Sequence, residues 1–512
     1  MSSSSSSSAK ADLMTKIVSL AKRRGFVFQS SEIYGGLKSC YDYGPLGAEL
    51  KRNIAGEWWR NMVYERENVV GIDASIMMHP KVWETSGHLG GFSDPLVDCL
   101  NCKERFRADK APRAEPGSAV EFVQGGKSGG AKLKGTVGSV GYVCPNCGSS
   151  SLSDERQFNL MFRTHLGPVD PLNEVAKELE GKALSATEIR TKLEEASRRT
   201  AIYLRPETAQ AMFVQFLNVQ QSMSMKVPFG IAQVGKSFRN EIVTEHFIFR
   251  SCEFEQMEME FFCEPGTEDE WMDYWTRERM AFYHKYANDK TAFRLRQHEE
   301  SELAHYAKKT YDVEYLYPWG WGELEGIASR TDYDLSKHAE ASGVKLSYFD
   351  QNKVDPATGK TGWRYTPYVI EPAAGLTRTL LCLLIDAYAE EHGVDAKGEA
   401  KTRVLLKLHP RLAPFKAAVL PLVSKDGQPE LAMEIVRAFR KHGINVSYDD
   451  KQSIGKRYSR HDEIGTPYCL TVDSESLQDR CVTIRDRDTA KQERISIDQA
   501  IETVKARLEA LA

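Results

Sequence analysis

Two segments separated by a short loop constrain the fold of this chain more than any other feature. Residues 235–241 read Gly-Lys-Ser-Phe-Arg-Asn-Glu, and residues 249–260 read Phe-Arg-Ser-Cys-Glu-Phe-Glu-Gln-Met-Glu-Met-Glu. Both segments alternate with a period of two, which predicts a pair of strands. One face of the second strand is apolar and suits a core: Met257, Met259 and Phe261. The other face is charged and aromatic: Arg250, Cys252, Phe254, Gln256 and Glu258.

The polar face of this hairpin suits a bound nucleoside triphosphate. Arginine binds phosphate, a carboxylate binds Mg²⁺ or an ammonium group, and phenylalanine stacks on a base. The first strand adds Arg239 and Glu241 to the same surface. A solvated face held together by salt bridges explains the same residues as well, so the hairpin alone leaves both interpretations open.

Bulk composition is that of a globular protein with several domains. The chain has 512 residues, 41% hydrophobic and 27% charged, which suggests roughly three domains. Its formal net charge of −4 gives no overall attraction to nucleic acid, so such a partner would need a local basic surface. No apolar run approaches the length of a membrane helix, and we expect no membrane partner.

Four of the ten cysteines form two Cys-x-x-Cys pairs, Cys99 with Cys102 and Cys144 with Cys147. Each pair can place two thiolates on one ion, so we predict a structural Zn²⁺ site, with four reduced and unligated thiols as the alternative. The other six cysteines are scattered, which fits a reducing, cytoplasmic location.

The composition along the chain predicts the following organisation. The ranges are a disordered serine-rich tail at 1–12, one domain split between 13–96 and 203–391, a cysteine-rich insertion at 97–160, a charged helical insertion at 161–202, a linker at 392–402, and a C-terminal domain at 403–512. The last range alternates apolar strands and helices, which predicts a small α/β domain with a mostly parallel sheet.

Longer motifs identify a family. Phe-Arg-x-Glu, a loop and Arg-x-x-x-Phe around the hairpin resemble motif 2 of class II aminoacyl-tRNA synthetases, and residues 367–378 (Pro-Tyr-Val-Ile-Glu-Pro-Ala-Ala-Gly-Leu-Thr-Arg) resemble motif 3. The sequences of residues 203–210 and 322–334 resemble those of the homodimeric glycyl-tRNA synthetases. The resemblance implies an α+β fold: a catalytic domain on an antiparallel sheet with helices, a C-terminal α/β anticodon-binding domain, and the inserted zinc-knuckle-like segment.

The resemblance also implies a reaction and its residues. The chain would activate glycine with ATP and Mg²⁺ and transfer it to tRNA(Gly), as a homodimer. Arg239 would bridge the α-phosphate and the glycine carboxylate, Arg378 would close the other side of the nucleotide, and Glu325 would bind ATP through Mg²⁺; these three are the catalytic set. The implied ATP site comprises Arg239, Asn240, Glu241, Phe249, Arg250, Phe254, Leu324, Glu325, Arg330, Gly375 and Arg378.

Glycine has no side chain, so its recognition must use its ammonium group and its small size. The resemblance implies a pocket of Arg107, Glu207, Phe254, Gln256, Glu258, Glu371, Ala373 and Gly375. Carboxylates would hold the ammonium, and a filled pocket would reject any Cβ. Ala373 stands where the family often has serine.

The C-terminal domain has one obvious basic cluster, Lys456, Arg457, Tyr458 and Arg460. The cations could bind tRNA phosphates and the ring could stack on a base. A solvated basic helix is the alternative.

Two other functions compete with the leading one. A non-catalytic relative, such as the polymerase accessory subunit that shares this fold, should have lost the motif arginines and pocket glutamates, yet all are present here. A class II synthetase for another amino acid would need room for a side chain, which three glutamates around a small pocket do not leave.

Overall fold

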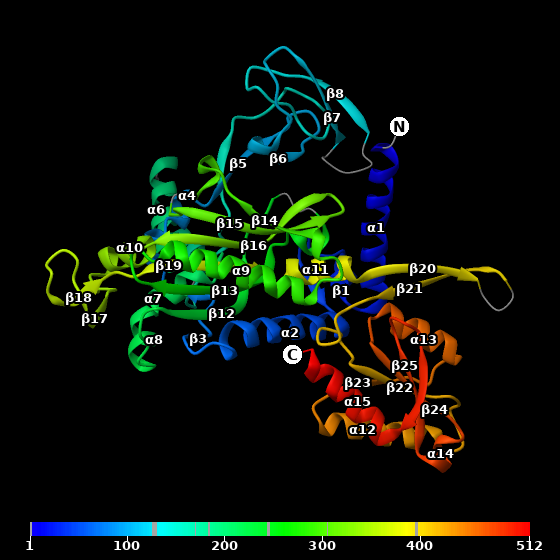
Figure 1. The fold of residues 1–512 in the computed structure, drawn as a ribbon. Helices are drawn as coiled ribbons and strands as arrows, with labels where there is room; N and C mark the ends of the chain where they lie inside the picture. Colours follow the sequence, from blue (N-terminus) through cyan, green and yellow to red (C-terminus); the bar gives the residue numbers. More distant parts are fainter. Residues whose placement is uncertain are drawn as a thin grey trace.

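The computed structural model describes residues 3–124, 131–168, 170–182, 185–242, 246–304, 306–394 and 398–511. A seven-stranded sheet forms the centre of the larger domain (Figure 1). It is antiparallel except for the pairing of β12 with β3. Its strands, in order across the sheet, are β14 (Phe293–Gln297), β15 (Lys309–Tyr317), β16 (Gly320–Thr331), β19 (Tyr368–Gly375), β13 (Glu253–Cys263), β12 (Phe229–Phe238) and β3 (Val69–Gly71).

The predicted hairpin is β12 and β13, whose register pairs Gly235 with Gln256 and Ser237 with Phe254. Its apolar face is buried in the main core, as the alternation predicts. The regular strands are shorter than the sequence suggests, because β12 ends at Phe238 and β13 begins at Glu253. Arg239 and Arg250 lie just outside the two strands, in irregular backbone next to the polar face.

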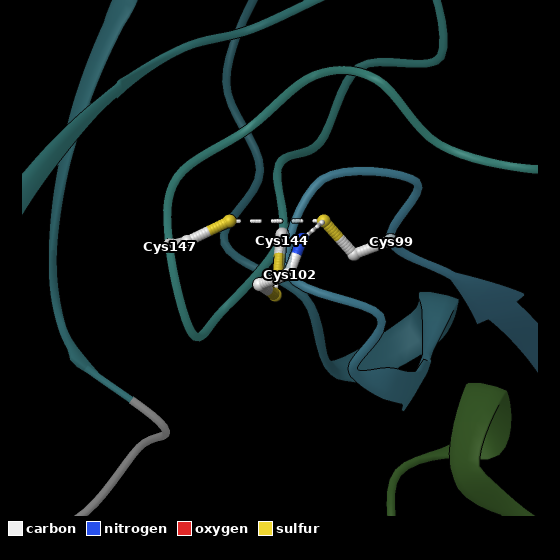
Figure 2. Close-up of side chains that lie close together, drawn as sticks. All are labelled: Cys99, Cys102, Cys144 and Cys147. Carbon is white, nitrogen blue, oxygen red and sulfur yellow. Dashed lines mark hydrogen bonds between the residues drawn. The ribbon is translucent and has the colours of Figure 1, made fainter.

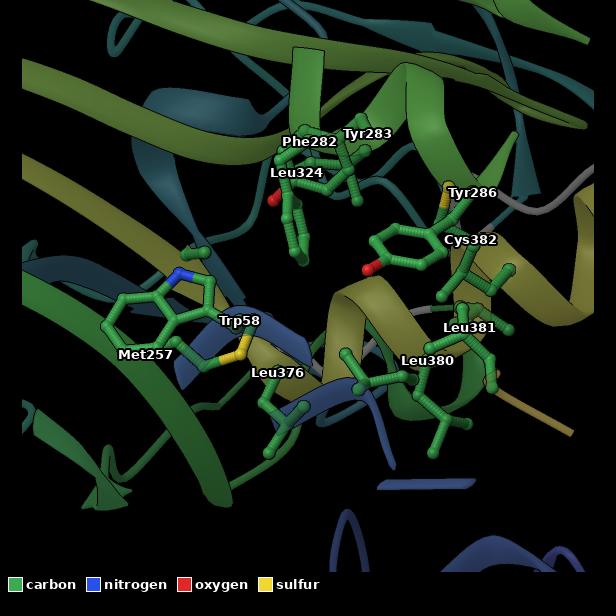
Figure 3. Packing of buried hydrophobic residues seen from close by; sticks show 14 of the residues in the cluster. Trp58, Met257, Phe282, Tyr283, Tyr286, Leu324, Leu376, Leu380, Leu381 and Cys382 are labelled. Carbon is green, nitrogen blue, oxygen red and sulfur yellow. The ribbon is translucent and has the colours of Figure 1, made fainter. Parts of the chain in front are cut away.

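Three helices cover the core face of the sheet: α2 (Pro45–Trp59), α9 (Glu268–Tyr286) and α11 (Leu376–Ala387). Figure 3 shows Trp58 of α2 facing Met257 of β13, and the leucines of α11 meeting the aromatic side chains of α9. Four apolar residues spaced four positions apart are buried, with the last in a π-helical turn, Arg60–Tyr64: Leu50, Ile54, Trp58 and Met62. Burying one such side chain contributes about 1.5–3 kcal/mol.

The opposite face of the sheet is covered only in part. At one end, α7 (Ala209–Val214), α8 (Phe216–Ser222) and α10 (Tyr333–Ser342) surround a second apolar cluster. Further along, α3 (Pro80–Thr85), α4 (His88–Gly91) and the small sheet of β10 (Arg163–His165), β11 (Ala201–Leu204) and β4 (Met77–Met78) follow. The remaining face is open.

The N-terminal prediction needs a correction. Helix α1 spans Ser3–Arg24, so its backbone is helical through most of the 1–12 range predicted to be disordered. Ile17, Leu20 and Ala21 anchor the helix in the core. Serine lowers helix stability by only a few tenths of a kcal/mol relative to good helix formers, so a nucleated helix extends through such a run at small cost.

The cysteine-rich insertion forms a separate unit above the catalytic sheet (Figure 1). Strand β5 (Ser93–Asp98) pairs with β6 (Arg105–Arg107) and β9 (Arg156–Asn159), and β7 (Ala119–Val123) pairs with β8 (Lys132–Thr136). Most of the glycine-rich stretch at 125–135, expected to be a flexible loop, lies outside the described residues. The charged insertion is helical as predicted, with α5 (Pro171–Leu179) and α6 (Ala186–Thr200).

The predicted linker at 392–402 is wrong as a description of the backbone. Strands β20 (Tyr388–Val394) and β21 (Ala400–Leu406) pair in register as an antiparallel arm, drawn in yellow in Figure 1. The glycine and charged residues of this range suggested a coil. Backbone N–H and C=O groups of the two strands pair with each other, and this pairing does not depend on which side chains are present. A second projecting hairpin is β17 (Tyr348–Val354) with β18 (Thr361–Tyr365).

The C-terminal domain has the predicted α/β architecture. Strands β23, β22 and β24 are parallel, and β25 and β26 extend the sheet in antiparallel fashion. Within the described residues, no helix is both long enough and apolar enough to span a membrane. The elements are β22 (Ala417–Pro421), α12 (Gln428–Lys441), β23 (Val446–Tyr448), α13 (Ile454–Glu463), β24 (Tyr468–Val472), α14 (Ser476–Asp479), β25 (Cys481–Asp486), β26 (Gln492–Ser496) and α15 (Ile497–Ala510).

Candidate active site

A cavity of about 380 Å³ opens on the polar face of the sheet, over β13, β16 and β19. Its walls contain most of the residues predicted for a nucleotide and an amino acid. The predicted residues that line it are Glu207, Arg239, Glu241, Phe249, Arg250, Phe254, Gln256, Glu258, Glu371, Ala373, Gly375 and Arg378. Segments from Glu207 to Arg378 therefore converge on one site.

Arg239 is held between two aromatic rings. Its guanidinium lies 5.3 Å from the ring centres of both Phe92 and Phe254, and its Nε donates to the carbonyl oxygen of Pro206 at 3.0 Å. Such cation–π contacts and a fixed hydrogen bond orient a planar cation before any substrate arrives. The remaining guanidinium N–H groups can bind phosphate or carboxylate.

A second arginine, Arg378, lines the same cavity. Its Nε donates to the carbonyl oxygen of Phe249 at 3.2 Å, and its guanidinium lies 4.6 Å above the Phe249 ring. Its Nη1 lies 3.2 Å from a carboxylate oxygen of Glu323, and this charge lowers the pKa of Glu323. At Gly375 a Cβ would approach the Arg378 side chain to 3.3 Å, so glycine there leaves room for this arginine.

The prediction that Glu325 binds Mg²⁺ with ATP is wrong. Glu325 has no exposed surface, and its Oε1 accepts from Nε of Arg279 at 2.6 Å in the core. A β-bulge explains the difference, because Glu323 pairs with Glu314 while Glu325 pairs with Val313, so one extra residue lies between them. The bulge places Glu323 and Gly326, rather than Glu325, on the cavity wall, and Leu324 is buried in the core.

Two buried carboxylates, Glu258 and Glu371, and the partly buried Glu207 form the amino-acid end of the cavity. Thr208 donates its backbone N–H to Glu258 at 3.0 Å and its hydroxyl to the same oxygen, and Gln256 donates to the other oxygen at 2.6 Å. Burial, with the nearby charges of Glu371 and Glu207, raises the pKa of Glu258 to about 8. Glu371 likewise has a raised pKa because of burial. A cation entering this site would lower both pKa values.

Arg330 does not line the cavity, contrary to the prediction for phosphate. Its Nη1 donates to both oxygens of Glu371 at 2.9 Å, and its Nε and Nη2 donate to Asp334 at 2.7 and 2.9 Å. With four such bonds and almost no exposure, Arg330 neutralises the acidic pocket from behind. Its sequence position near the motif could not show this, since the burial depends on α10.

Two further predicted residues lie outside the cavity wall. Arg107 pairs with Asp94 at 2.6 Å and with Asp109 at 2.8 Å, and the Asp109 hydrogen bond raises its pKa. The backbone N–H of Asn240 donates to Leu160 at 2.7 Å. Residues 243–245, between the two strands of the predicted hairpin, lie outside the described residues.

Sequence reasoning missed part of the wall. Strand β15 contributes Thr310 and Asp312, and His298 contacts Asp312 at 2.7 Å. These residues belong to no recognised motif, and only the pairing of β15 with β16 brings them to the site. His88, which lies 3.2 Å from Glu207, was also missed.

The four predicted zinc ligands lie together. The Sγ atoms of Cys99, Cys102, Cys144 and Cys147 are all within 4.8 Å of one another, and the closest pairs are 3.7 Å apart (Figure 2). Four thiolates at 2.3 Å from one Zn²⁺ would lie about 3.8 Å apart, so the donor set fits this ion. Backbone N–H groups of Cys102 and Asn146 also point at Sγ atoms, at 3.5 and 3.4 Å.

The predicted tRNA-binding cluster divides into exposed and buried residues. Lys456 is exposed at the start of α13. The prediction for Arg457 is wrong, since it is buried and donates to the carbonyl oxygens of Pro421, Asp449 and Leu422. Tyr458 bonds Thr471 at 2.6 Å beneath the Arg485 guanidinium, and Arg460 pairs with Asp449. Residues on one face of a helix recur every three or four positions, so neighbouring residues of such a cluster point in different directions.

Comparison with known proteins agrees with this site. The family described as tRNA synthetase class II core domain (G, H, P, S and T) matches residues 192–387, and the family described as anticodon binding domain matches residues 416–507. The glycine–tRNA ligase of Treponema denticola is 48% identical over 97% of both chains, and that of Thermobifida fusca is 46% identical over 98% of this chain and 99% of its own.

A solved structure of prolyl-tRNA synthetase from Cryptosporidium parvum, complexed with halofuginone and AMPPNP, has a similar fold. Its TM-score is 0.56 at 14% identity, over 97% of this chain and 75% of that one. The chain is nearly half identical to these two ligases over almost its whole length, and it contains the cavity described above. It therefore belongs to the class II glycine–tRNA ligases.

Proposed function

We propose that this chain joins glycine to tRNA(Gly) in two steps at the cavity described above, as the names of its relatives indicate. The observation that carries the proposal is the joint presence, in one cavity, of two fixed arginines and three carboxylates: Arg239, Arg378, Glu207, Glu258 and Glu371. Arginines without the carboxylates would suit nucleotide binding alone. The combination suits an anion and an ammonium group held side by side.

In the first step the glycine carboxylate attacks the α-phosphate of ATP, giving glycyl-adenylate and pyrophosphate. Arg239 lies against Phe254 and near enough to Glu258 for its charge to lower the pKa of that carboxyl, and there it would hold both the glycine carboxylate and the α-phosphate. Arg378 would neutralise charge on the other side of the nucleotide. Catalysis then comes from positioning and electrostatic stabilisation, and the chain needs no covalent intermediate.

In the second step a ribose hydroxyl at the 3′ end of tRNA attacks the adenylate carbonyl and releases AMP. The same arginines would hold the leaving phosphate. Glu323 and Asp312 are carboxylates of the cavity wall that would hold a Mg²⁺ ion bound together with ATP. It would supply positive charge at the phosphates.

Selection of glycine follows from the crowding at the acidic end. Ala373 lies opposite both Glu258 and Gly326 in the sheet, so these short side chains and the glutamates surround the amino acid closely. A Cβ on the substrate would collide with this wall. Larger substrates are excluded sterically, and no editing site is required.

We propose that the four cysteines hold a structural Zn²⁺. A shell of four thiolates leaves no open position for substrate, so the ion would stabilise the inserted unit. The unit has only a small apolar core of its own, around Val97, Phe106 and Tyr142.

We also propose that the chain is a homodimer that works in the cytosol. Three large apolar side chains in one short segment are exposed, Ile33 by 87%, Tyr34 by 86% and Leu37 by 59%. The segment adjoins a cavity of about 520 Å³ beside α2. Light scattering of Ile33→Glu tests the dimer: the variant should be monomeric, and an unchanged mass would place the interface elsewhere. None of the ten cysteines forms a disulfide, which fits a reducing compartment.

The function is tested by charging tRNA(Gly) transcripts with labelled glycine in the presence of ATP and Mg²⁺. Glycine should be attached to the 3′ end, and the reaction should stop when ATP is omitted. Absence of charging by folded protein that still binds ATP would instead favour a non-catalytic relative.

A further inference from the structure

Ser86 and His88 form a short series of polar contacts that ends at Glu207, on the wall of the cavity. Ser86 Oγ lies 2.8 Å from Nδ1 of His88, and Nε2 of His88 lies 3.2 Å from a carboxylate oxygen of Glu207. The rings of Trp83 and Phe92 pack against the imidazole, with centroids 5.5 and 5.4 Å away. The ring is therefore fixed in place, and one of its nitrogens faces a carboxylate of the cavity.

The contact to Glu207 survives a change in the charge of the imidazole. In the neutral ring Nε2–H donates to Glu207, while Nδ1 accepts from the Ser86 hydroxyl. In the imidazolium both nitrogens donate, and the same hydroxyl can accept because it carries lone pairs as well as a proton. Ser86 can then donate to the carbonyl oxygen of Trp83, 3.5 Å away. Titration thus adds one positive charge next to Glu207 without moving the ring.

We propose that His88 is a positioning residue for Glu207, and that protonation of His88 weakens the binding of the amino-acid substrate. This inference rests on the proposed function, because it takes the ammonium group of glycine as the ligand of Glu207. A neutral imidazole orients the carboxylate and leaves its negative charge for the substrate. An imidazolium neutralises that charge and repels a second cation.

The electrostatics of Glu207 agree with this competition. Burial opposes its ionisation, but the positive charge of His88 holds the pKa of Glu207 well below its ordinary value. The other donor to Glu207 is the neutral amide of Gln210, at 3.1 Å. Of these two described donors to Glu207, His88 is the one with an ionisable side chain.

Other ionisable groups surround this pair and must be separated from it. On the His88 side, His79, Lys81 and Glu84 of the α3 segment are exposed, and Arg156 of β9 pairs with Asp98 at 2.6 Å. On the Glu207 side lie Arg330, Glu258 and Glu371. Any effect of these groups persists when His88 is replaced by a neutral side chain, which is the basis of the test.

The test compares wild type with His88→Gln in glycine-dependent ATP–pyrophosphate exchange from pH 5.5 to 8.5, at saturating ATP. The glutamine amide can still donate to Glu207 but cannot become charged. We expect the ratio of the wild-type KM for glycine to that of the variant to rise by about tenfold per pH unit on the acid side, with little change in the ratio of kcat. A ratio that stays constant with pH overturns the inference.

His442→Gln, an exposed histidine after α12, serves as the matched control and should follow wild type at every pH. If circular dichroism shows that His88→Gln is unfolded, His88→Asn gives the same test with a shorter amide. Absence of glycine-dependent exchange by wild type at every pH would refute the proposed function itself. Exchange with a constant ratio refutes only the role of His88.

Discussion

At the scale of single residues, the acidic pocket combines charges that would repel one another without their partners. Glu258 is satisfied by Thr208 and Gln256, and Glu371 is paired with Arg330. Glu260 lies two residues after Glu258 on β13 and is buried, and neither of its carboxylate oxygens is hydrogen-bonded among the described residues. Burial raises the pKa of Glu260 well above its ordinary value. The pocket is therefore short of positive charge, which the substrate ammonium can supply.

This shortage predicts how stability depends on pH. The pKa of Glu258 rises from about 4.5 to about 8 on folding, so its protonated form stabilises the fold at low pH and this contribution is lost as pH rises through about 8. Urea unfolding should show wild type losing free energy of unfolding relative to Glu258→Gln between pH 5 and 8.5, by at most about 1.4 kcal/mol per pH unit. Glycine with ATP should reduce the loss. A difference independent of pH would show that Glu258 does not titrate in this range.

A second prediction at this scale concerns Arg239. A lysine would keep the charge, but its ammonium group cannot form bidentate hydrogen bonds or stack as a plane between Phe92 and Phe254. Arg239→Lys should lower kcat/KM for exchange by about 10²–10³-fold with an unchanged unfolding midpoint. Activity near that of wild type would show that only the charge of Arg239 matters.

At the scale of elements, sequence patterns predicted the strands and helices well and their irregularities poorly. The alternation along residues 254–261 correctly separates the cavity face from the core face. The bulge in β16 could not be predicted, since it depends on the pairing of two strands, and it moves the cavity-facing carboxylate from Glu325 to Glu323. Arg330 and Arg457 were misplaced for a similar reason, because charge in a motif does not show which side of an element is buried.

The bulge leads to a paired prediction. Glu323→Gln should reduce exchange activity and raise the Mg²⁺ concentration needed for it, without loss of stability. Glu325→Gln should instead leave the charge of Arg279 buried without its ion pair and lower the free energy of unfolding by about 3–5 kcal/mol. Thermal unfolding and exchange assays on both variants check this. If Glu325→Gln instead raised the required Mg²⁺ concentration and Glu323→Gln instead lowered stability, Glu325 would be the Mg²⁺ ligand.

The inserted cysteine unit gives another prediction. Purified protein should contain one Zn²⁺ per chain, and Cys144→Ser should lower this content and expose residues 97–160 to proteolysis. Cys481→Ser, an unpaired cysteine in the C-terminal domain, is the control and should retain the metal. Full-length protein without bound metal and with an intact insertion would favour four reduced thiols.

At the scale of the whole molecule, the C-terminal domain is attached to the catalytic domain by buried and half-buried ion pairs. Glu57 of α2 accepts from Arg411 at 2.5 Å and from the Tyr286 hydroxyl at 2.7 Å. Arg23 and Arg24 of α1 both contact Glu463 of α13. The sequence indicated a separate C-terminal domain but not these contacts, because their partners lie hundreds of positions apart.

This arrangement predicts a separation of the two steps. Lys456 is exposed on α13, away from the catalytic cavity, and its charge would contact tRNA rather than ATP. Lys456→Glu should raise the KM for tRNA in charging by about tenfold and leave exchange unchanged. Lys505→Glu on α15 is the control with the same charge change. Equal effects of both variants on charging would indicate a general loss of attraction rather than a contact at Lys456.

The most direct test of the account is amino-acid-dependent ATP–pyrophosphate exchange by the purified chain with glycine, alanine and serine. The acidic, crowded pocket around Glu207, Glu258 and Glu371 predicts exchange with glycine and almost none with the other two. Comparable exchange with alanine or serine, or silence with all three in a folded protein that binds ATP, would contradict the assignment of this cavity.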